Sequence, residues 1–163
     1  MRASLEQHLG SRQVGRVVYG SIIGMALVVT LDSHPPTAWV MTLWLLGTAL
    51  AVGLAEIYSE VVGAETSTRQ PVRRSQLHRM IEDAAAVGFG VAFPAVFFLL
   101  AVLGLLTLET AFSIAKWSGV GLIGFYGFWA ARFAGSSPGR ALLKGAMVAL
   151  VGAGLIGLKA LVH

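Results

Sequence analysis

The stretch GTALAVGLAEIYSEVVGAE, residues 47–65, places carboxylates inside a segment that otherwise has the composition of a membrane span. A charged side chain near the middle of a bilayer costs roughly 3 kcal/mol, so such residues usually face the protein interior, water or a cation. Glu56 and Glu60 share one face of a helix, and Gly53 leaves space one turn earlier. The pattern predicts a carboxylate stripe that faces a cation. For Glu60 and Glu65, simple solvation at the headgroup level is the alternative.

The composition indicates an integral membrane protein. Of the 163 residues, 56% are hydrophobic, 12% are charged and 20 are glycine, which is too apolar for a soluble domain. The chain has no cysteine, which excludes disulfides, thiolate metal sites and a cysteine nucleophile. The net charge of +4 is spread over short loops beside apolar segments, which favours membrane lipids as partners and argues against nucleic acid.

Five apolar segments predict an all-α integral membrane protein with five transmembrane helices in one membrane domain, residues 1–163. The expected spans are about 14–31, 38–62, 78–108, 111–133 and 141–162, and a short interfacial helix is expected at 4–12. The polar stretch 63–77 is predicted to be a solvated basic loop without internal structure. Pro94 is expected to kink the third span.

Small residues mark the faces where helices are expected to pack closely. Gly20 and Gly24 stand in GxxxG spacing in the first span. The last span carries small residues at strict four-residue intervals, namely Gly145, Ala149, Ala153 and Gly157. Both patterns predict helix–helix contacts, and the second is expected to form a continuous packing seam.

The basic residues predict the orientation of the chain. With the N-terminus in the cytoplasm and the C-terminus outside, ten of the 12 Lys and Arg residues fall on the cytoplasmic side, as the positive-inside rule requires. Only Lys116 and Lys159 are then left outside. Five of the 8 acidic residues gather toward the cytoplasmic face, namely Glu56, Glu60, Glu65, Glu82 and Asp83.

The start of the third span carries a second set of candidate metal ligands. His78 and Glu82 lie one helical turn apart, a spacing compatible with a divalent transition metal such as Fe, Mn or Zn, and Asp83 follows them. The alternative is that acids at a helix start are favoured by the helix dipole alone. No Ser-His-Asp spacing, phosphate loop or HExxH motif is present, so we do not expect an enzyme.

Three segments resemble the vacuolar iron transporter family. Residues 47–65 are similar to its second helix, which combines small residues with Gly, Tyr, Ser and a terminal acid. GFGVAFPAVFFLL, residues 88–100, resembles its third helix with an internal Pro, and ALLKGAMVALVGAGLIGL, residues 141–158, resembles its last helix. The resemblance implies a homodimer that exports a divalent cation of the Fe or Mn class from the cytoplasm, in exchange for protons. Glu56 would be the main ligand or proton carrier, with Glu60 assisting, and no resident cofactor is expected.

Two features differ from the family pattern. The family's first helix opens with an Asp-Gly pair whose acid lines the ion path, whereas Tyr19 precedes Gly20 here. Its eukaryotic members carry a long Glu-rich cytoplasmic domain where this chain has a short basic loop. Metal capture is therefore expected to rely on four residues at the start of the third span, namely His78, Met80, Glu82 and Asp83. The expected location of the protein is the plasma (inner) membrane of a prokaryote.

Tyr19 also supports a rival function. A non-transporting membrane scaffold or partner-binding protein of the same fold would need no acid at this position, and a small cation channel is a third alternative. If ions do pass, Tyr19, Tyr58 and Ser59 are the residues expected to line their path. For Tyr58 and Ser59, hydrogen bonding between helices is the alternative role.

Overall fold

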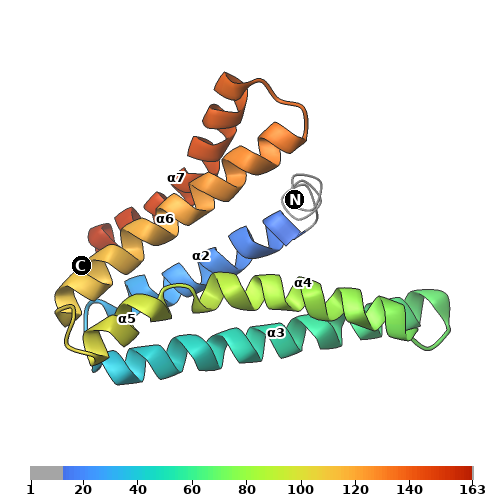
Figure 1. Cartoon of the computed structure of the whole chain (residues 1–163), viewed down its shortest axis with the longest axis horizontal. Coiled ribbons are helices and arrows are strands. Elements are labelled where there is room, and N and C mark those ends of the chain that lie inside the picture. Colours follow the sequence, from blue (N-terminus) through green and yellow to red (C-terminus); the bar gives the residue numbers. More distant parts are fainter. Residues whose placement is uncertain (1–12, 163) are drawn as a thin grey trace.

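The computed structural model describes residues 13–162, and all regular structure in this part of the chain is helical (Figure 1). The helices are α2 (Gln13–Leu31), α3 (Ala38–Thr68), α4 (Arg74–Ala92), α5 (Ala95–Val102), α6 (Leu108–Phe133) and α7 (Pro138–Val162). The prediction of an all-α fold is confirmed for these residues. The interfacial helix expected at 4–12 lies outside the described residues.

Several helices are long and apolar enough to span a membrane. They are α2, α3 and α7, and the bent pair α4–α5 adds a fourth candidate when it is counted as one span. Helix α6 has 26 residues and is long enough to span a membrane. Lys116, Arg132 and its many glycines lower its hydropathy, so it is less apolar than the candidate spans. The described helices thus provide three or four candidate spans, and the fifth span and the orientation stay predictions.

The third predicted span is broken at Pro94, as the sequence analysis expected. Helix α4 ends at Ala92, α5 begins at Ala95, and the two axes differ in direction by 49°. Proline has no N–H group to donate to the preceding turn, and its ring clashes with the carbonyl there, so the helix cannot continue straight. The prediction of a kink is confirmed.

The prediction that residues 63–77 form a loop without internal structure is wrong over most of that range. Helix α3 continues to Thr68 and α4 starts at Arg74, so the loop comprises only residues 69–73. Arg69 adopts a left-handed backbone conformation with φ 54° and its N–H donates to the Glu65 carbonyl, which ends α3, and Pro71 prevents it from resuming. With 31 residues, α3 is about 46 Å long, which exceeds the ~30 Å core of a bilayer. The connected ends of α3 and α4 project beyond the other helices (Figure 1).

Helices α2 and α4 cross at very short range because glycines lie on both sides of the contact. A Cβ atom at Gly24 would lie 2.6 Å from the carbonyl oxygen of Val91, and one at Gly20 would overlap the carbonyl oxygen of Val87. On α4, a Cβ at Gly90 would overlap the backbone of α2. The predicted GxxxG contact of the first span is therefore confirmed.

The predicted seam on α7 is confirmed in part. Gly145 packs against the backbone of α6, where a Cβ would lie 2.8 Å from the carbonyl oxygen of Gly124. Gly157 has no atom within 4 Å of the Cβ position and is exposed. Because an α-helix has 3.6 residues per turn, a strict four-residue stripe rotates about 40° at each step and leaves the contact face. Gly152, seven residues after Gly145, is buried there instead.

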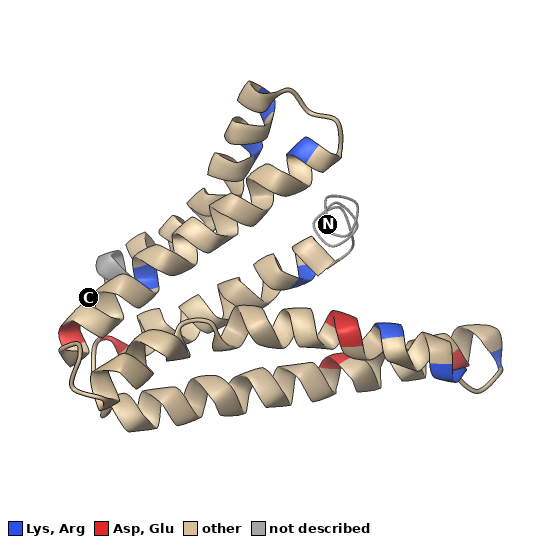
Figure 2. Ribbon diagram, viewed as in Figure 1, with Lys and Arg blue, Asp and Glu red and all other residues tan. Residues whose placement is uncertain are grey.

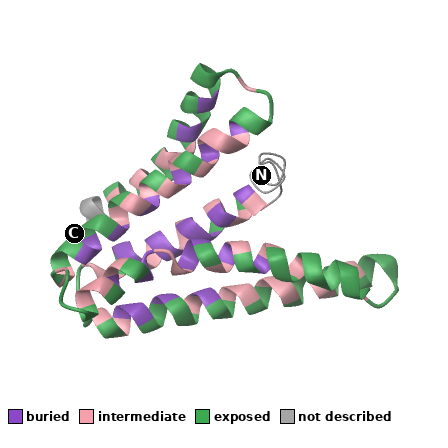
Figure 3. Ribbon diagram, in the orientation of Figure 1, coloured by how far each residue is buried: buried purple, intermediate pink, exposed green. Residues whose placement is uncertain are grey.

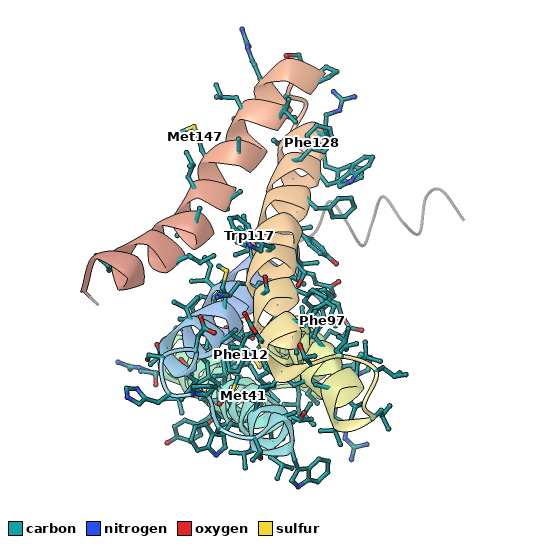
Figure 4. All side chains as sticks on the ribbon, turned by 90° about the vertical axis from the view of Figure 1, so that its left-hand side faces the viewer. Met41, Phe97, Phe112, Trp117, Phe128 and Met147 are labelled. Carbon is teal, nitrogen blue, oxygen red and sulfur yellow. The ribbon has the colours of Figure 1, made fainter. Side chains whose placement is uncertain are left out.

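The two ends of the bundle are packed differently. A cluster of buried side chains from α2, α3, α5 and α6 fills the end where α2 finishes, namely Val28, Met41, Leu45, Ala95, Phe98, Ala111, Phe112 and Ala115. Within it the rings of Phe98 and Phe112 meet edge to face at 4.8 Å between centroids. Figure 4 shows Met41, Phe97 and Phe112 close together in the lower part of the view, where this cluster lies. Phe128 and Met147 lie higher, on the hairpin of α6 and α7. The outer faces of α3 and α7 are largely exposed (Figure 3), which is typical of lipid-facing helices.

Candidate functional site

Three carboxylates from two helices converge on one guanidinium. Arg16, in the first turn of α2, forms ion pairs with Glu56 and Glu60 of α3 and with Asp83 of α4, the last at 3.6 Å between Nη2 and Oδ2. We call these four residues the acid cluster. Figure 2 shows acidic positions of α3 and α4 at the same level along the two helices. The sequence analysis predicted the three acids, and the structure brings them together.

The helix geometry explains why the groups meet. Gly20 and Gly24 of α2 lie against Val87 and Val91 of α4, and four residues separate the members of each pair. One step further toward the N-terminal ends of both helices, the same register places Arg16 beside Asp83. Glu56 and Glu60 present one face of α3 to this point, since they stand one turn apart. The close glycine contact therefore sets the distance at which the charges face each other.

The acid cluster carries an excess of negative charge. A guanidinium has five N–H donors in a planar fork and can serve several carboxylates at once, but it supplies only one positive charge. With all three acids ionised, the formal sum is two negative charges. The side chains are only partly exposed, at 22% for Arg16, 23% for Glu56, 24% for Glu60 and 15% for Asp83. Such a group attracts cations, because water screens its charge incompletely.

In this arrangement Arg16 is the cation that contacts all three carboxylates. Among residues 13–162, no three His, Asp or Glu side chains are placed so that they would hold a metal ion. A cation that binds Glu56, Glu60 and Asp83 together must therefore displace the guanidinium. Carboxylate oxygens are hard ligands, which suit divalent cations such as Mn²⁺ and Fe²⁺ once the position is free.

The other predicted ligands lie outside the acid cluster. His78 Nε2 and Glu82 Oε1 are 3.3 Å apart one turn from each other on α4, with 76% and 51% of their side chains exposed. Tyr19 and Tyr58 are 52% and 72% exposed, and Ser59 is exposed too, so all three lie on the surface of the described bundle. The structure thus brings Asp83 to Glu56 and Glu60, but it does not bring His78, Glu82 or the path residues there.

The sequence analysis missed Arg16 as a member of the site and counted it only as a topogenic charge. A signal was present in the sequence: Arg16, Gly20 and Gly24 follow each other at four-residue intervals and therefore share one helix face. A basic residue that continues a close-packing glycine face is directed toward the neighbouring helix. The acids on the next two spans were then its natural partners.

A second ion pair ties α2 at its other end. Lys116 Nζ of α6 donates to Asp32 Oδ2, just after the last residue of α2, at 2.6 Å. The two side chains are 22% and 31% exposed. Helix α2 is therefore bound electrostatically at both ends, to α3 and α4 through Arg16 and to α6 through Asp32. The sequence analysis counted Lys116 only as a charge on the outer side of the membrane.

Three cavities lie between the helices, and two of them are at the Arg16 end of the bundle. The first, of about 360 Å³, lies between α2, α4 and α6 and includes Gln13, Glu82 and Tyr126 in its lining. The second, of about 460 Å³, is an apolar groove between α3 and α4 beside Gly53 and Gly88. The third, of about 420 Å³, lies between α2, α6 and α7. The described bundle is thus hollowed at the end that holds the acid cluster and filled by buried side chains at the other.

These features define a helical protein with several helices suited to a membrane and a partly buried ionic cluster between three of them. Comparison of the chain with protein-family models, with curated proteins and with solved structures gives no match. The function is therefore inferred from the acid cluster itself and from the way the helices surround it.

Proposed function

We propose that the protein is a membrane transporter that exports a divalent cation of the Fe or Mn class from the cytoplasm in exchange for protons. The observation that carries this proposal is the convergence of Glu56, Glu60 and Asp83 on the single guanidinium of Arg16. A purely structural ion pair needs one acid for one base. Two further carboxylates at a position with little solvent are costly unless they bind something, and cations are what they attract.

In this proposal Arg16 is a tethered cation that holds the acid cluster when no ion is bound. A divalent cation entering the cluster pushes the guanidinium aside, and Arg16 returns when the cation leaves. The charge count gives the number of protons exchanged for each cation. Three carboxylates and Arg16 sum to two negative charges, which either one divalent cation or two protons neutralise. We therefore expect an electroneutral exchange of two protons for each divalent cation.

The uneven packing of the bundle supports an alternating mechanism. The acid cluster and two of the cavities lie at one end, while buried side chains and the Lys116–Asp32 pair close the other. We assign the open end to the cytoplasm, since the basic residues gather there. The arrangement then corresponds to a state open to the inside. Opening of the outer end would require the pair between Asp32 and Lys116 to separate.

The proposal includes five spans, with the N-terminus inside and the C-terminus outside in a plasma membrane. Helix α6 is the fifth span in this topology. Two features support it: the 26 residues of α6 run from one end of the bundle to the other, and its glycines pack closely on α7. Inward packing explains its lower hydropathy, because a helix that buries much of its surface in protein needs fewer apolar side chains.

The test is cation flux through the purified full-length protein in liposomes under an imposed pH gradient. We expect wild type to move Mn²⁺ or Fe²⁺, and Glu56→Gln to reduce the rate to that of empty liposomes, because the amide keeps the shape but lacks the exchangeable charge. The matched control is Glu65→Gln on the same helix, whose side chain is exposed and lies outside the acid cluster. Equal rates for Glu56→Gln and wild type would refute the assignment.

The rival function is a membrane scaffold in which Arg16 and the acids only clamp α2 to α3 and α4. The exposed Tyr19, where the resembled family has an acid, favours this alternative. The same experiment separates the two, since a scaffold moves no cation under any gradient. A channel would move cations without moving protons, which a pH-sensitive dye inside the liposomes detects.

A further inference from the structure

Three cations surround the turn between α6 and α7. Arg132, Arg140 and Lys144 are all exposed there. Lys144 Nζ donates to Ser136 Oγ at 3.2 Å, and Arg132 Nη1 donates to the carbonyl oxygen of Ser136 at 2.7 Å. Among the residues that the structure describes, none of the three cations has a carboxylate within salt-bridge distance. Their charge is therefore not neutralised by the described part of the chain.

This differs from the other basic residues that lie within the bundle. Arg16 pairs with three acids and Lys116 pairs with Asp32. After Glu109, by contrast, the sequence contains no Asp or Glu at all. The N-terminus of α7 lies at the same turn, and the helix dipole adds partial positive charge to it. The turn is thus a positively charged surface, and the acid of α6, Glu109, lies in the first turn at the other end of that helix.

An apolar cavity lies directly beside this positive surface. It has a volume of about 420 Å³, and among the residues that line it are Val14, Gly15 and Val18 of α2, Ala130 of α6, and Met147 and Val148 of α7. Lys144 is the one charged residue of the lining. The hairpin of α6 and α7 diverges from α2 toward this end of the bundle (Figure 1). The cavity is therefore a space between helices, apolar inside and positive at its rim.

We propose that this cavity binds one anionic phospholipid from the leaflet that meets the α6–α7 turn. Its phosphate would lie among Arg132, Arg140 and Lys144, and one acyl chain would fill the apolar space between α2 and α7. The volume lies within the roughly 300–1,000 Å³ of small-ligand pockets. Basic pockets between membrane helices are suited to acidic headgroups in the same way. A free anion would bind to the three cations only and would not fill the apolar cavity beside them.

The test is native mass spectrometry of the full chain in detergent, titrated with dioleoylphosphatidylglycerol or dioleoylphosphatidylcholine. We expect one phosphatidylglycerol per chain, bound more tightly than phosphatidylcholine. Lys144→Gln should weaken phosphatidylglycerol binding about fivefold, and removal of all three cations roughly hundredfold. The matched control is Arg74→Gln, which removes an exposed cation from the start of α4, away from the cavity lining, and should leave binding unchanged.

A second variant tests the acyl-chain part without a change of charge. Gly15→Leu places a larger side chain in the cavity, and nothing lies within 4 Å of the Cβ position, so the helix accepts it. We expect it to lower phosphatidylglycerol affinity while Lys144 stays in place. Equal affinity for the two lipids, or unchanged binding by Gly15→Leu, would overturn the proposal. Displacement of the lipid by millimolar inorganic phosphate would identify a free-anion site and overturn it as well.

Discussion

At the scale of single residues, Arg16 decides what the acids of α3 and α4 can do. Without it, Glu56, Glu60 and Asp83 would be three neighbouring carboxylates that repel one another in a partly buried position. With it, the helices are held together and the cluster keeps two negative charges for a cation or protons. The same side chain therefore contributes stability and competes with the proposed substrate.

We predict that Arg16→Gln destabilises the protein and that a divalent cation restores the loss. Removing one partner of a buried ion pair costs about 3–5 kcal/mol, and the partial exposure of this cluster lowers the expected cost to roughly 2 kcal/mol. Millimolar Mn²⁺ should restore the lost stability, since a ligand that binds only the folded state stabilises it by mass action. Thermal unfolding in detergent, with and without Mn²⁺, measures both effects.

Glu65→Gln is the control for this experiment, because it changes an exposed residue of α3 outside the acid cluster. It should leave both the unfolding temperature and its response to Mn²⁺ as in wild type. A destabilised Arg16→Gln protein that gains nothing from Mn²⁺ would mean that the acids form only a clamp. That result would favour the scaffold over the transporter.

At the scale of elements, glycine positions determine which helix faces touch. Gly20, Gly24 and Gly90 let α2 and α4 approach closely, and Gly124 and Gly145 do the same for α6 and α7. At Gly20, Gly24, Gly90 and Gly145 a side chain would meet backbone atoms first, which move less easily than the end of another side chain. Glycines elsewhere on the same helices, such as Gly121 and Gly157, face open space.

We predict opposite effects for two glycines of α7 that belong to the same four-residue stripe. Gly145→Ala should destabilise the α6–α7 hairpin by about 1–3 kcal/mol, because its Cβ would lie 2.8 Å from the carbonyl oxygen of Gly124. Gly157→Ala should leave stability unchanged or raise it slightly, since alanine is the better helix former and the space is open. Unfolding in detergent measures the stability of both variants. Equal losses of stability would support the original prediction of a continuous packing seam along α7.

At the scale of the whole molecule, the two ends of the bundle are packed differently, and the proposed transport assigns a separate role to each. The end with the acid cluster is hollowed and charged, and the end with Phe98 and Phe112 is filled with buried apolar side chains. Helix α2 links them through Arg16 and Asp32. A change that breaks one ion pair while the other holds would let α2 tilt between two positions, which is what alternating access requires.

Introduced cysteines test the predicted topology. The chain contains no cysteine of its own, so each variant carries a single thiol that can react. Gln70→Cys in the loop after α3 and Ser137→Cys in the turn after α6 should both be protected from an impermeant thiol reagent applied outside intact cells. Ser33→Cys, after α2, should react. If α6 does not cross the membrane, Ser137→Cys reacts from outside while Gln70→Cys stays protected, and the five-span topology fails.

The sequence by itself determined the class of fold and the membership of much of the site. High apolar content and long uninterrupted segments lead to membrane helices, because a bilayer leaves the backbone no other partner for its hydrogen bonds. The kink at Pro94 and the contact at Gly24 followed from local chemistry, as did the selection of Glu56, Glu60 and Asp83. These are properties of one segment and its solvent, so no other segment is needed to deduce them.

Only the tertiary structure decided that Arg16 is the partner of these acids and that Gly152, instead of Gly157, lies in the α7 contact. Both outcomes depend on the crossing and rotation of helices that are far apart in the sequence. A helix offers several faces of similar composition, and the packing of its neighbours selects one of them. Helix α3 likewise continues beyond its apolar segment to Thr68, which the polar composition of residues 63–68 did not indicate.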